Sequence, residues 1–398
     1  MTLSGALLES RSPSHHNPSD QAGLLRLAFD ATSLLGPVTG VGTFAREVLH
    51  RLAARPHVEV TAFAVTARGR RGLLAALPPG VAASRRPLPA KIARAAWLRA
   101  DRPTVEDLTG PVDVVHGPNF VVPPASGAGE VVTVHDLTAL RHPEMCTADV
   151  LQWPPLLRRA ARRGAWVHCV SEFVADEVRE AFPEVGDRVA VVPNGVSRPP
   201  EETPRSSAAR GRHLAGSDRY VLAVGTVEPR KDLATLVRSF DAVAAEHPDL
   251  RLVLAGPDGW GAADLTAAID AARHRRRVVR FGWVDDDTRY ALMRGASVVA
   301  YASRYEGFGL VPLDAMSVAT PVVATRAGAV PEVVGDAARL VPVGDVGSLA
   351  GAIDEVLADD ALRERLVAAG LERVERFGWD RTVDGLAEVY ERARDERR

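Results

Sequence analysis

The chain is organised around short runs of apolar residues, each followed by a longer helix-like segment. Runs that are apolar on both faces are typical of strands in a parallel sheet that helices cover on both sides. They occur at 25–29, 58–65, 112–116, 131–135, 166–170, 189–192, 220–224, 252–255, 278–281, 298–301 and 322–324. Because strands and helices alternate, the pattern predicts doubly wound α/β folding.

Two series of these runs are separated by a segment, 198–217, that is rich in Pro, Ser, Arg, Gly and Glu and shows no periodicity. A chain of 398 residues is long for one core, so we interpret this segment as an interdomain linker. The expected organisation is a tail at 1–22, a first domain at 23–197, a second at 218–378 and a terminal helix at 379–398. Ligands of such folds bind at the carboxyl ends of the strands, which favours a site between the domains.

Composition narrows the class of protein. The formal net charge is -2, which gives no reason to expect nucleic acid as a partner. No apolar run reaches the roughly 18 residues that span a bilayer, and the polar start lacks a signal-peptide pattern, so the tail is expected to be disordered and the protein cytoplasmic. The basic stretch 85–102 leaves two interpretations open, an ordinary surface helix or a peripheral contact with the inner membrane face.

The most informative segment is 305–316, which follows one apolar run and opens a helix. Gly307 and Gly309 let the backbone approach a ligand closely, and free N–H groups at a helix start suit a phosphate. Glu306 and Asp314 are spaced so that one carboxylate reaches sugar hydroxyls and the other a ribose. A plain strand-to-helix turn with Glu306 as a solvated acid is the alternative.

A second segment, 224–232, places Arg230 and Lys231 at the start of a helix, after Gly225. Cations at that end of a helix oppose its dipole, so the pair indicates a nearby anion such as a diphosphate. The chain has only two lysines, Lys231 and Lys91, among many arginines. A retained lysine is therefore a mild hint of function, although Lys91 has no evident role.

Two weaker signals lie in the first domain. Gly40 and Gly42 precede a helix expected from about Phe44, and their loop could cover a diphosphate. His135 ends an apolar run at the edge where this fold binds ligands, and His116 competes for the same role. A simple turn and a structural histidine are the respective alternatives.

Missing motifs argue against several enzyme classes. The sequence has no Gly-Lys-Ser/Thr phosphate loop, no His-Glu-x-x-His, no Gly-x-Ser-x-Gly elbow and no zinc-ligand spacing. These absences argue against a nucleoside triphosphatase, a zinc protease and a serine hydrolase. No metal ligands and no cofactor are expected.

Taken together, the motifs resemble the family-4 retaining glycosyltransferases of the GT-B fold, which pair two facing Rossmann-like domains. The resemblance covers nearly the whole chain after residue 23. It rests on Glu306-Gly-Phe-Gly-Leu with an acid eight positions on, Gly225-Thr-Val-Glu-Pro-Arg-Lys-Asp, Val192-Pro-Asn-Gly-Val, Ala319-Thr-Pro-Val-Val and Phe377-Gly-Trp379. In the first domain, Thr39-Gly-Val-Gly, His116-Gly-Pro-Asn-Phe and Thr133-Val-His-Asp-Leu are similar to a subgroup rich in mannosyltransferases.

The resemblance implies a role for each candidate residue. Glu306 would contact donor sugar hydroxyls, the amides near Phe308, Gly309 and Leu310 the sugar and diphosphate, and Asp314 the ribose. Arg230 and Lys231 would bind the diphosphate, with Gly225, Gly40 and Gly42 close by, and His135 would lie near sugar and acceptor. The terminal helix after Trp379 would cross back to the first domain.

The implied reaction is transfer of a hexose, with retention, from a nucleotide-sugar donor to a glycan or lipid-linked acceptor. GDP-mannose is the first choice of donor, and the nucleotide sugar is a co-substrate, so no cofactor or metal is needed. Asp314 departs from the family pattern because it is one methylene shorter than the usual Glu. That departure keeps open a catalytically weak nucleotide-sugar-binding subunit, and a sugar-nucleotide epimerase is the other alternative.

Overall fold

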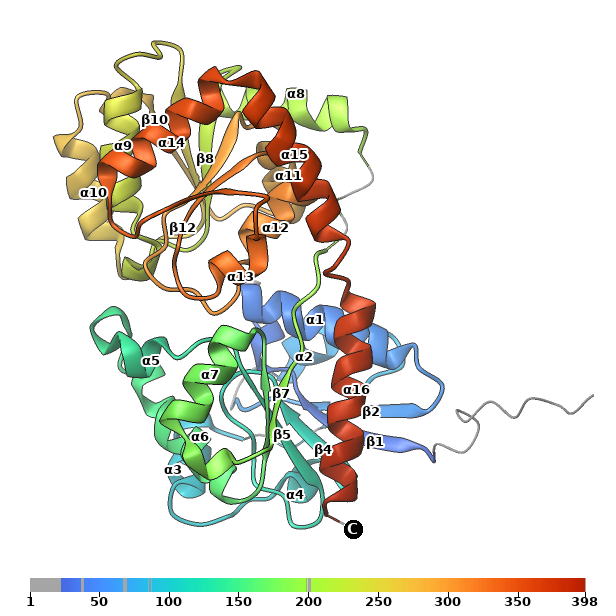
Figure 1. The fold of residues 1–398 in the computed structure, drawn as a ribbon. Coiled ribbons are helices and arrows are strands. Elements are labelled where there is room, and N and C mark those ends of the chain that lie inside the picture. The colour runs from blue at the N-terminus through green and yellow to red at the C-terminus, as the bar shows by residue number, and fades with distance from the viewer. Residues whose placement is uncertain are drawn as a thin grey trace, which may run out of the picture.

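The computed structural model describes residues 23–36, 39–66, 70–84, 86, 88–197, 199 and 202–397. The tail predicted at 1–22 lies outside the described residues. Two α/β domains face each other, and the C-terminal helix leaves the second domain and runs along the first (Figure 1). This is the arrangement that the alternating pattern and the family resemblance predict.

The first domain is built on a parallel sheet with strand order β3-β2-β1-β4-β5-β6-β7. Its strands are β1 (Leu25–Asp30), β2 (Val58–Phe63), β3 (Ala82–Ala83), β4 (Val114–Gly117), β5 (Gly129–Val134), β6 (Trp166–Cys169) and β7 (Val189–Val191). The chain reverses direction across the sheet between β1 and β4. In folds of this kind, ligands bind at the carboxyl ends of the two strands where the order reverses.

Helices cover both faces of this sheet. They are α1 (Gly40–Ala53), α2 (Arg70–Ala76), α3 (Ala90–Trp97), α4 (Val105–Thr109), α5 (Thr138–Arg141), α6 (Trp153–Arg162) and α7 (Glu172–Ala181). The expected start of α1 near Phe44 is wrong, because the helix begins at Gly40 after an extended Thr39. Gly40 and Gly42 thus belong to its first turn rather than to a loop, and the start of the helix lies against Leu310 of the second domain.

The second sheet has the same kind of strand order, β10-β9-β8-β11-β12-β13, which reverses between β8 and β11. Its strands are β8 (Tyr220–Val224), β9 (Arg251–Ala255), β10 (Val278–Gly282), β11 (Val298–Tyr301), β12 (Val322–Thr325) and β13 (Arg339–Val341). All predicted strands are present. The edge strands β3 and β13 were not predicted, because two alanines and a three-residue run beginning with an exposed Arg339 are too short to form a pattern.

The helices of the second domain are α8 (Pro204–Ala215), α9 (Leu233–Val243), α10 (Ala262–Ala271), α11 (Asp286–Gly295), α12 (Leu310–Ser317), α13 (Val330–Val334), α14 (Val346–Ala358) and α15 (Asp360–Val374). The segment expected to be an irregular linker, 198–217, contains α8. Thr203 caps its start, Pro204 occupies its first turn and Gly216 ends it in the left-handed conformation. Gly211 lies against the backbone of Ala291, so α8 packs tightly on α11.

The terminal helix α16 (Trp379–Asp395) confirms the predicted crossing. Its apolar stripe, Trp379, Val383, Leu386, Val389 and Tyr390, is buried in a cluster formed with α1 and the first sheet. Where it begins, Trp379 lies directly against Gly195, a position where no side chain would fit. The two chain crossings between the domains are therefore packed against each other.

Candidate functional site

The candidate site lies at the carboxyl ends of β8 and β11, which are neighbours in the second sheet. The loop after β8 carries Arg230 and Lys231 in a short turn, Pro229–Lys231, and Asp232 then caps α9. The loop after β11 carries Glu306. Lys231 and Glu306, which are 75 residues apart in the chain, are thus brought together because the strand order of the sheet reverses between β8 and β11.

Glu306 forms the centre of a buried ionic cluster. Its Oε1 lies 2.6 Å from Nζ of Lys231, and its Oε2 lies 2.6 Å from a terminal guanidinium nitrogen of Arg230. Lys231 also donates to the Tyr301 hydroxyl at 3.0 Å, and its ammonium lies over the Tyr301 ring. Within the chain, Glu306 is therefore the anion that the basic pair at the helix start requires.

The charges of this cluster depend on one another. Burial alone would raise the pKa of Glu306, but Arg230 and Lys231 outweigh it and lower the pKa to about 2. Burial lowers the pKa of Lys231, and burial raises the pKa of Glu228, whose carboxylate lies 3.3 Å from Arg230. Glu306 is fully ionised at neutral pH, and the carboxylates of Glu306, Asp136 and Glu228 all act on the charge of Arg230.

Glycine makes room for this cluster. Gly225 has φ +143, and a Cβ there would lie 3.5 Å from the Lys231 side chain. The lysine stem therefore packs against Gly225, and the predicted contact of Gly225 with a donor stays a prediction. Gly309, with φ +122, takes the last position before α12, which begins at Leu310 as the motif predicted.

Two helix starts face each other beside the cluster. A Cβ on Gly40, the first residue of α1, would lie 3.6 Å from the Leu310 side chain at the start of α12. Among the described residues no side chain caps either helix start, and the positive ends of the two helix dipoles favour an anion between them. Phe308 is buried before α12 and packs edge-on against Phe377.

Asp314 lies in the second turn of α12, but its carboxylate is already engaged. One oxygen forms an ion pair with Arg289, and the other accepts from the Tyr290 hydroxyl at 3.2 Å. Burial raises the pKa of Asp314. Arg289 and Tyr290 were missed at the level of sequence, because they follow a run of aspartates on α11 that matches no motif.

His135 lies one residue after β5, beside the loop that carries Glu306. A Cβ on Gly307 would be 1.7 Å from the His135 carbonyl oxygen, so only glycine fits there. Nε2 of His135 donates to the Pro118 carbonyl at 2.7 Å, and burial lowers the pKa of His135. His116, the competing candidate, is fully buried and bonded through both ring nitrogens, to Tyr390 and Thr133.

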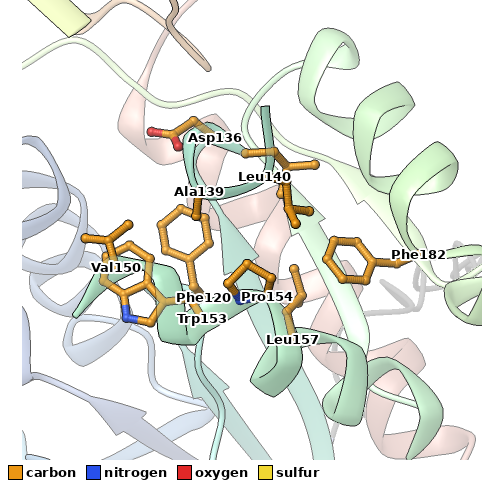
Figure 2. A pocket seen from close by; sticks show the side chains of 10 residues that line it. Phe120, Asp136, Ala139, Leu140, Val150, Trp153, Pro154, Leu157 and Phe182 are labelled. Carbon is orange, nitrogen blue, oxygen red and sulfur yellow. The ribbon is translucent and has the colours of Figure 1, made fainter. Parts of the chain in front are cut away.

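An apolar pocket lies in the first domain (Figure 2), and Asp136, the residue that follows His135, is part of its lining. It has about 280 Å³ of free space, partly open to solvent, between α5, α6 and the loop after β4. Phe120, which stacks on Trp153, has φ +60, an unusual conformation for a residue with a side chain. Asp136 lies at one end of the pocket, beside the otherwise apolar lining.

Neither a metal centre nor a membrane span was found in the part of the chain that the structure describes. No group of three or more His, Cys, Asp or Glu side chains is placed to hold a metal ion there. Within the same residues, no helix is long and apolar enough to cross a bilayer. In the basic stretch 85–102, α3 buries Trp97 and leaves Ile92 exposed.

Comparisons with known proteins agree with this geometry. A family model described as "Glycosyl transferases group 1" matches residues 207–373, and one described as "Glycosyltransferase Family 4" matches residues 38–198. The chain is 29% identical over 283 residues to an O-antigen chain mannosyltransferase B of Escherichia coli, a match that covers 70% of this chain and 74% of the relative.

Two further comparisons are similar in kind. A phosphatidyl-myo-inositol mannosyltransferase of Mycolicibacterium smegmatis is 35% identical over 216 residues, a match that covers 52% of this chain and 53% of the relative. The chain therefore spans about half the length of that relative. The structure of HepE from Anabaena in complex with UDP and glucose superimposes with a TM-score of 0.67 at 20% identity, covering 92% of this chain and 98% of that chain. With two family models matching successive halves and a shared two-domain fold, the chain belongs to the group 1, family 4 glycosyltransferases.

Proposed function

We propose that this protein transfers a hexose, with retention, from a nucleoside diphosphate sugar to a hydroxyl of a glycan or lipid-linked acceptor. The observation that carries the proposal is the cluster of Arg230, Lys231 and Glu306 at the carboxyl ends of β8 and β11, between two facing helix starts. Mannose is the first choice of sugar, because mannosyltransferases are among the relatives.

The cluster suits a donor that carries both a diphosphate and a sugar. A diphosphate competes with Glu306 for Arg230 and Lys231, and its charge is then met by a fork-shaped and a point cation together with helix amides. The carboxylate of Glu306, released from part of its ion pairs, can accept hydrogen bonds from sugar hydroxyls. Charge growing on the leaving diphosphate is stabilised by groups already in place, which is the largest catalytic effect here.

The first domain supplies the acceptor side in this proposal. His135 and Asp136 lie beside the Glu306 loop, and the apolar pocket next to them offers a surface for a nonpolar part of the acceptor (Figure 2). His135 donates through Nε2 to Pro118, so neutral Nδ1 is left as an acceptor for a hydroxyl. The proposal includes a peripheral contact of the basic stretch 85–102 with the inner membrane face.

The first test is thermal unfolding of the purified protein with GDP, UDP, ADP and dTDP, each with and without magnesium. A ligand that binds only the native state at about 100 times its dissociation constant adds about 2.7 kcal/mol. Stabilisation by one diphosphate identifies the base, and equal stabilisation without magnesium supports a metal-independent site. If none of the four stabilises the protein, the donor site assigned to Arg230, Lys231 and Glu306 is wrong.

A second assay separates transfer from the alternatives. Donor turnover that needs an acceptor and yields a glycosylated product supports a transferase. Turnover of donor alone into another nucleotide sugar indicates an epimerase. Diphosphate binding without any turnover indicates a binding subunit, the alternative that the short side chain of Asp314 keeps open.

A further inference from the structure

We propose that helix α7 of the first domain is a clamp that positions the Glu306 loop of the second domain. Its positioning residues are Ser171, which caps α7, and two residues of the second domain that contact α7, Tyr305 and Glu332. The inference rests on the proposed function of Glu306 and deepens it. None of the three residues needs to touch the donor, because each acts on the backbone or the neighbours of Glu306.

The first contact holds the residue before Glu306. The Tyr305 hydroxyl donates to a carboxylate oxygen of Glu177 on α7 and accepts from the Leu137 amide at 3.1 Å. Arg141 binds the other Glu177 oxygen at 3.0 Å, so the carboxylate is fixed on both sides. Tyr305 is buried, and its side chain is thereby tied to the first domain.

The second contact holds the residue after Glu306. Ser171, which caps the start of α7, donates through its hydroxyl to the Gly307 carbonyl at 2.8 Å and accepts from the Val174 amide at 3.1 Å. Both hydrogen-bonding roles of this fully buried hydroxyl are therefore used. Since Gly307 also lies against the His135 carbonyl, the backbone has no room to shift at this point.

The third contact reaches Glu306 through α13. The Glu306 carbonyl accepts from the Ala329 amide at 2.8 Å, immediately before α13. On that helix, Glu332 accepts from the amides of Glu172 and Phe173 in the first turn of α7, at 2.9 and 3.0 Å. A carboxylate at a helix start gains from the dipole as well as from the two hydrogen bonds.

The three contacts converge on one loop, and all come from one helix. α7 holds Tyr305 and Gly307 directly and holds the carbonyl of Glu306 through α13. Arg230 and Lys231, in contrast, make their hydrogen bonds and ion pairs within the second domain, and the first domain acts on Arg230 through the charge of Asp136. We therefore expect diphosphate binding to depend mainly on the second domain, and sugar positioning by Glu306 to need the closed clamp.

The test uses Tyr305→Phe, Glu332→Gln and the double variant of the full chain. Phe keeps the buried ring and loses the hydroxyl contacts, and Glu332 is exposed, so neither change should prevent folding. Glu364→Gln on α15 is the matched control, because Glu364 is an exposed acid of the second domain for which the described residues show no contact with the first. Donor turnover, the dissociation constant of the nucleoside diphosphate and small-angle X-ray scattering are measured for each protein.

The expected result is a split between chemistry and binding. Each single variant should lower kcat roughly tenfold, because a hydrogen bond to a charged group is lost, while the diphosphate dissociation constant stays within about threefold. The double variant should show a larger radius of gyration than the control. Equal losses of kcat and diphosphate affinity, or an unchanged kcat, would overturn the clamp.

Failure of the clamp differs from failure of the proposed function. If the wild type binds no diphosphate and turns over no donor, the proposed function is wrong. The scattering measurement still tests the clamp in that case. A double variant as compact as the wild type would then refute it.

Discussion

The two domains share one strand order but differ in the polar groups that their strands and strand ends carry, which are charged in the second domain and neutral in the first. In the second domain, the loops after β8 and β11 bring together Arg230, Lys231 and Glu306, all ionised. In the first domain, β4, β5 and β6 carry His116, Thr133 and His168, which are fully buried near α16 and uncharged. The same strand order therefore carries an ionic cluster in one domain and a neutral polar core in the other.

The hydrogen-bond directions in the neutral core follow from its chemistry. Val192 offers a carbonyl to His168 Nε2 at 2.8 Å, so this nitrogen must carry the proton and Nδ1 must accept from Thr133. Thr133 then accepts from Nε2 of His116, and Nδ1 of His116 accepts from Tyr390 at 2.7 Å. A directed chain of hydrogen bonds thus anchors α16, and it works only while both histidines are neutral.

The largest effect is expected from Lys231→Ala, which disrupts the charged cluster of the second domain. The change removes a buried cation from both Glu306 and the proposed diphosphate, so kcat/KM for the donor should fall by about a hundredfold or more. Steady-state donor consumption measures it.

Lys91→Ala is the matched control for this variant, because Lys91 is the only other lysine and is exposed on α3. It should retain full turnover. Unchanged turnover in Lys231→Ala would remove Lys231 from the donor site.

Glu306→Gln tests the same cluster through pH. With a pKa of about 2 in the folded protein and about 4.3 unfolded, Glu306 stabilises the fold fully above roughly pH 4.5 and loses this contribution as the pH falls towards 2. The variant should therefore lose roughly 3 kcal/mol less stability than the wild type between pH 5 and 2. At pH 7 it should be less stable by about 3–5 kcal/mol, because the buried Lys231 loses its ion pair and Arg230 loses the shorter of its two ion pairs.

Chemical denaturation at a series of pH values measures both effects. Glu364→Gln, an exposed acid, provides the control. If Glu306→Gln and the wild type lose stability in parallel at low pH, the ion pairs with Arg230 and Lys231 do not hold in solution.

The sequence was informative where chemistry and local pattern coincide. The strands are apolar on both faces, and Glu306, Gly309 and Lys231 lie in motifs between a strand and a helix, so these features could be predicted. Arg289 and Tyr290 could not, because their only signal is proximity to Asp314, which the packing of α11 on α12 creates. α8 was missed because its polar sequence has no apolar period, although Thr203, Pro204 and Gly216 mark its ends.

A smaller effect is expected from disrupting the neutral hydrogen-bond chain of the first domain. Tyr390→Phe removes the donor at the head of the chain and leaves Nδ1 of His116 buried without a partner, which should cost about 1–3 kcal/mol of unfolding free energy. Diphosphate binding should not change, because the second domain is untouched. A loss of diphosphate affinity alongside an unchanged stability would contradict the structural role of this chain.

His168 adds a pH dependence to the first domain. Burial lowers its pKa to about 4, below an unfolded value of about 6.5. Its neutral form therefore contributes fully above pH 6.5, and the contribution is lost as the pH falls from there towards 4. The free energy of unfolding should fall in that window, before Glu306 begins to titrate. The fluorescence of Trp166 and Trp379, which are buried beside this core, follows the unfolding.

The smallest effect is expected from Asp314→Glu, which asks whether the charged site tolerates the longer side chain usual in the family. Both oxygens of Asp314 are already bonded, so an added methylene must displace Arg289 or Tyr290 and should cost about 1 kcal/mol of stability. The displaced carboxylate would then reach a ribose more easily, and affinity for the nucleoside diphosphate should rise about two- to fivefold. Calorimetric titration measures this rise, with Asp264→Glu on the exposed face of α10 as control. A fall in affinity would instead mean that the pair of Asp314 with Arg289 is itself part of the nucleotide site.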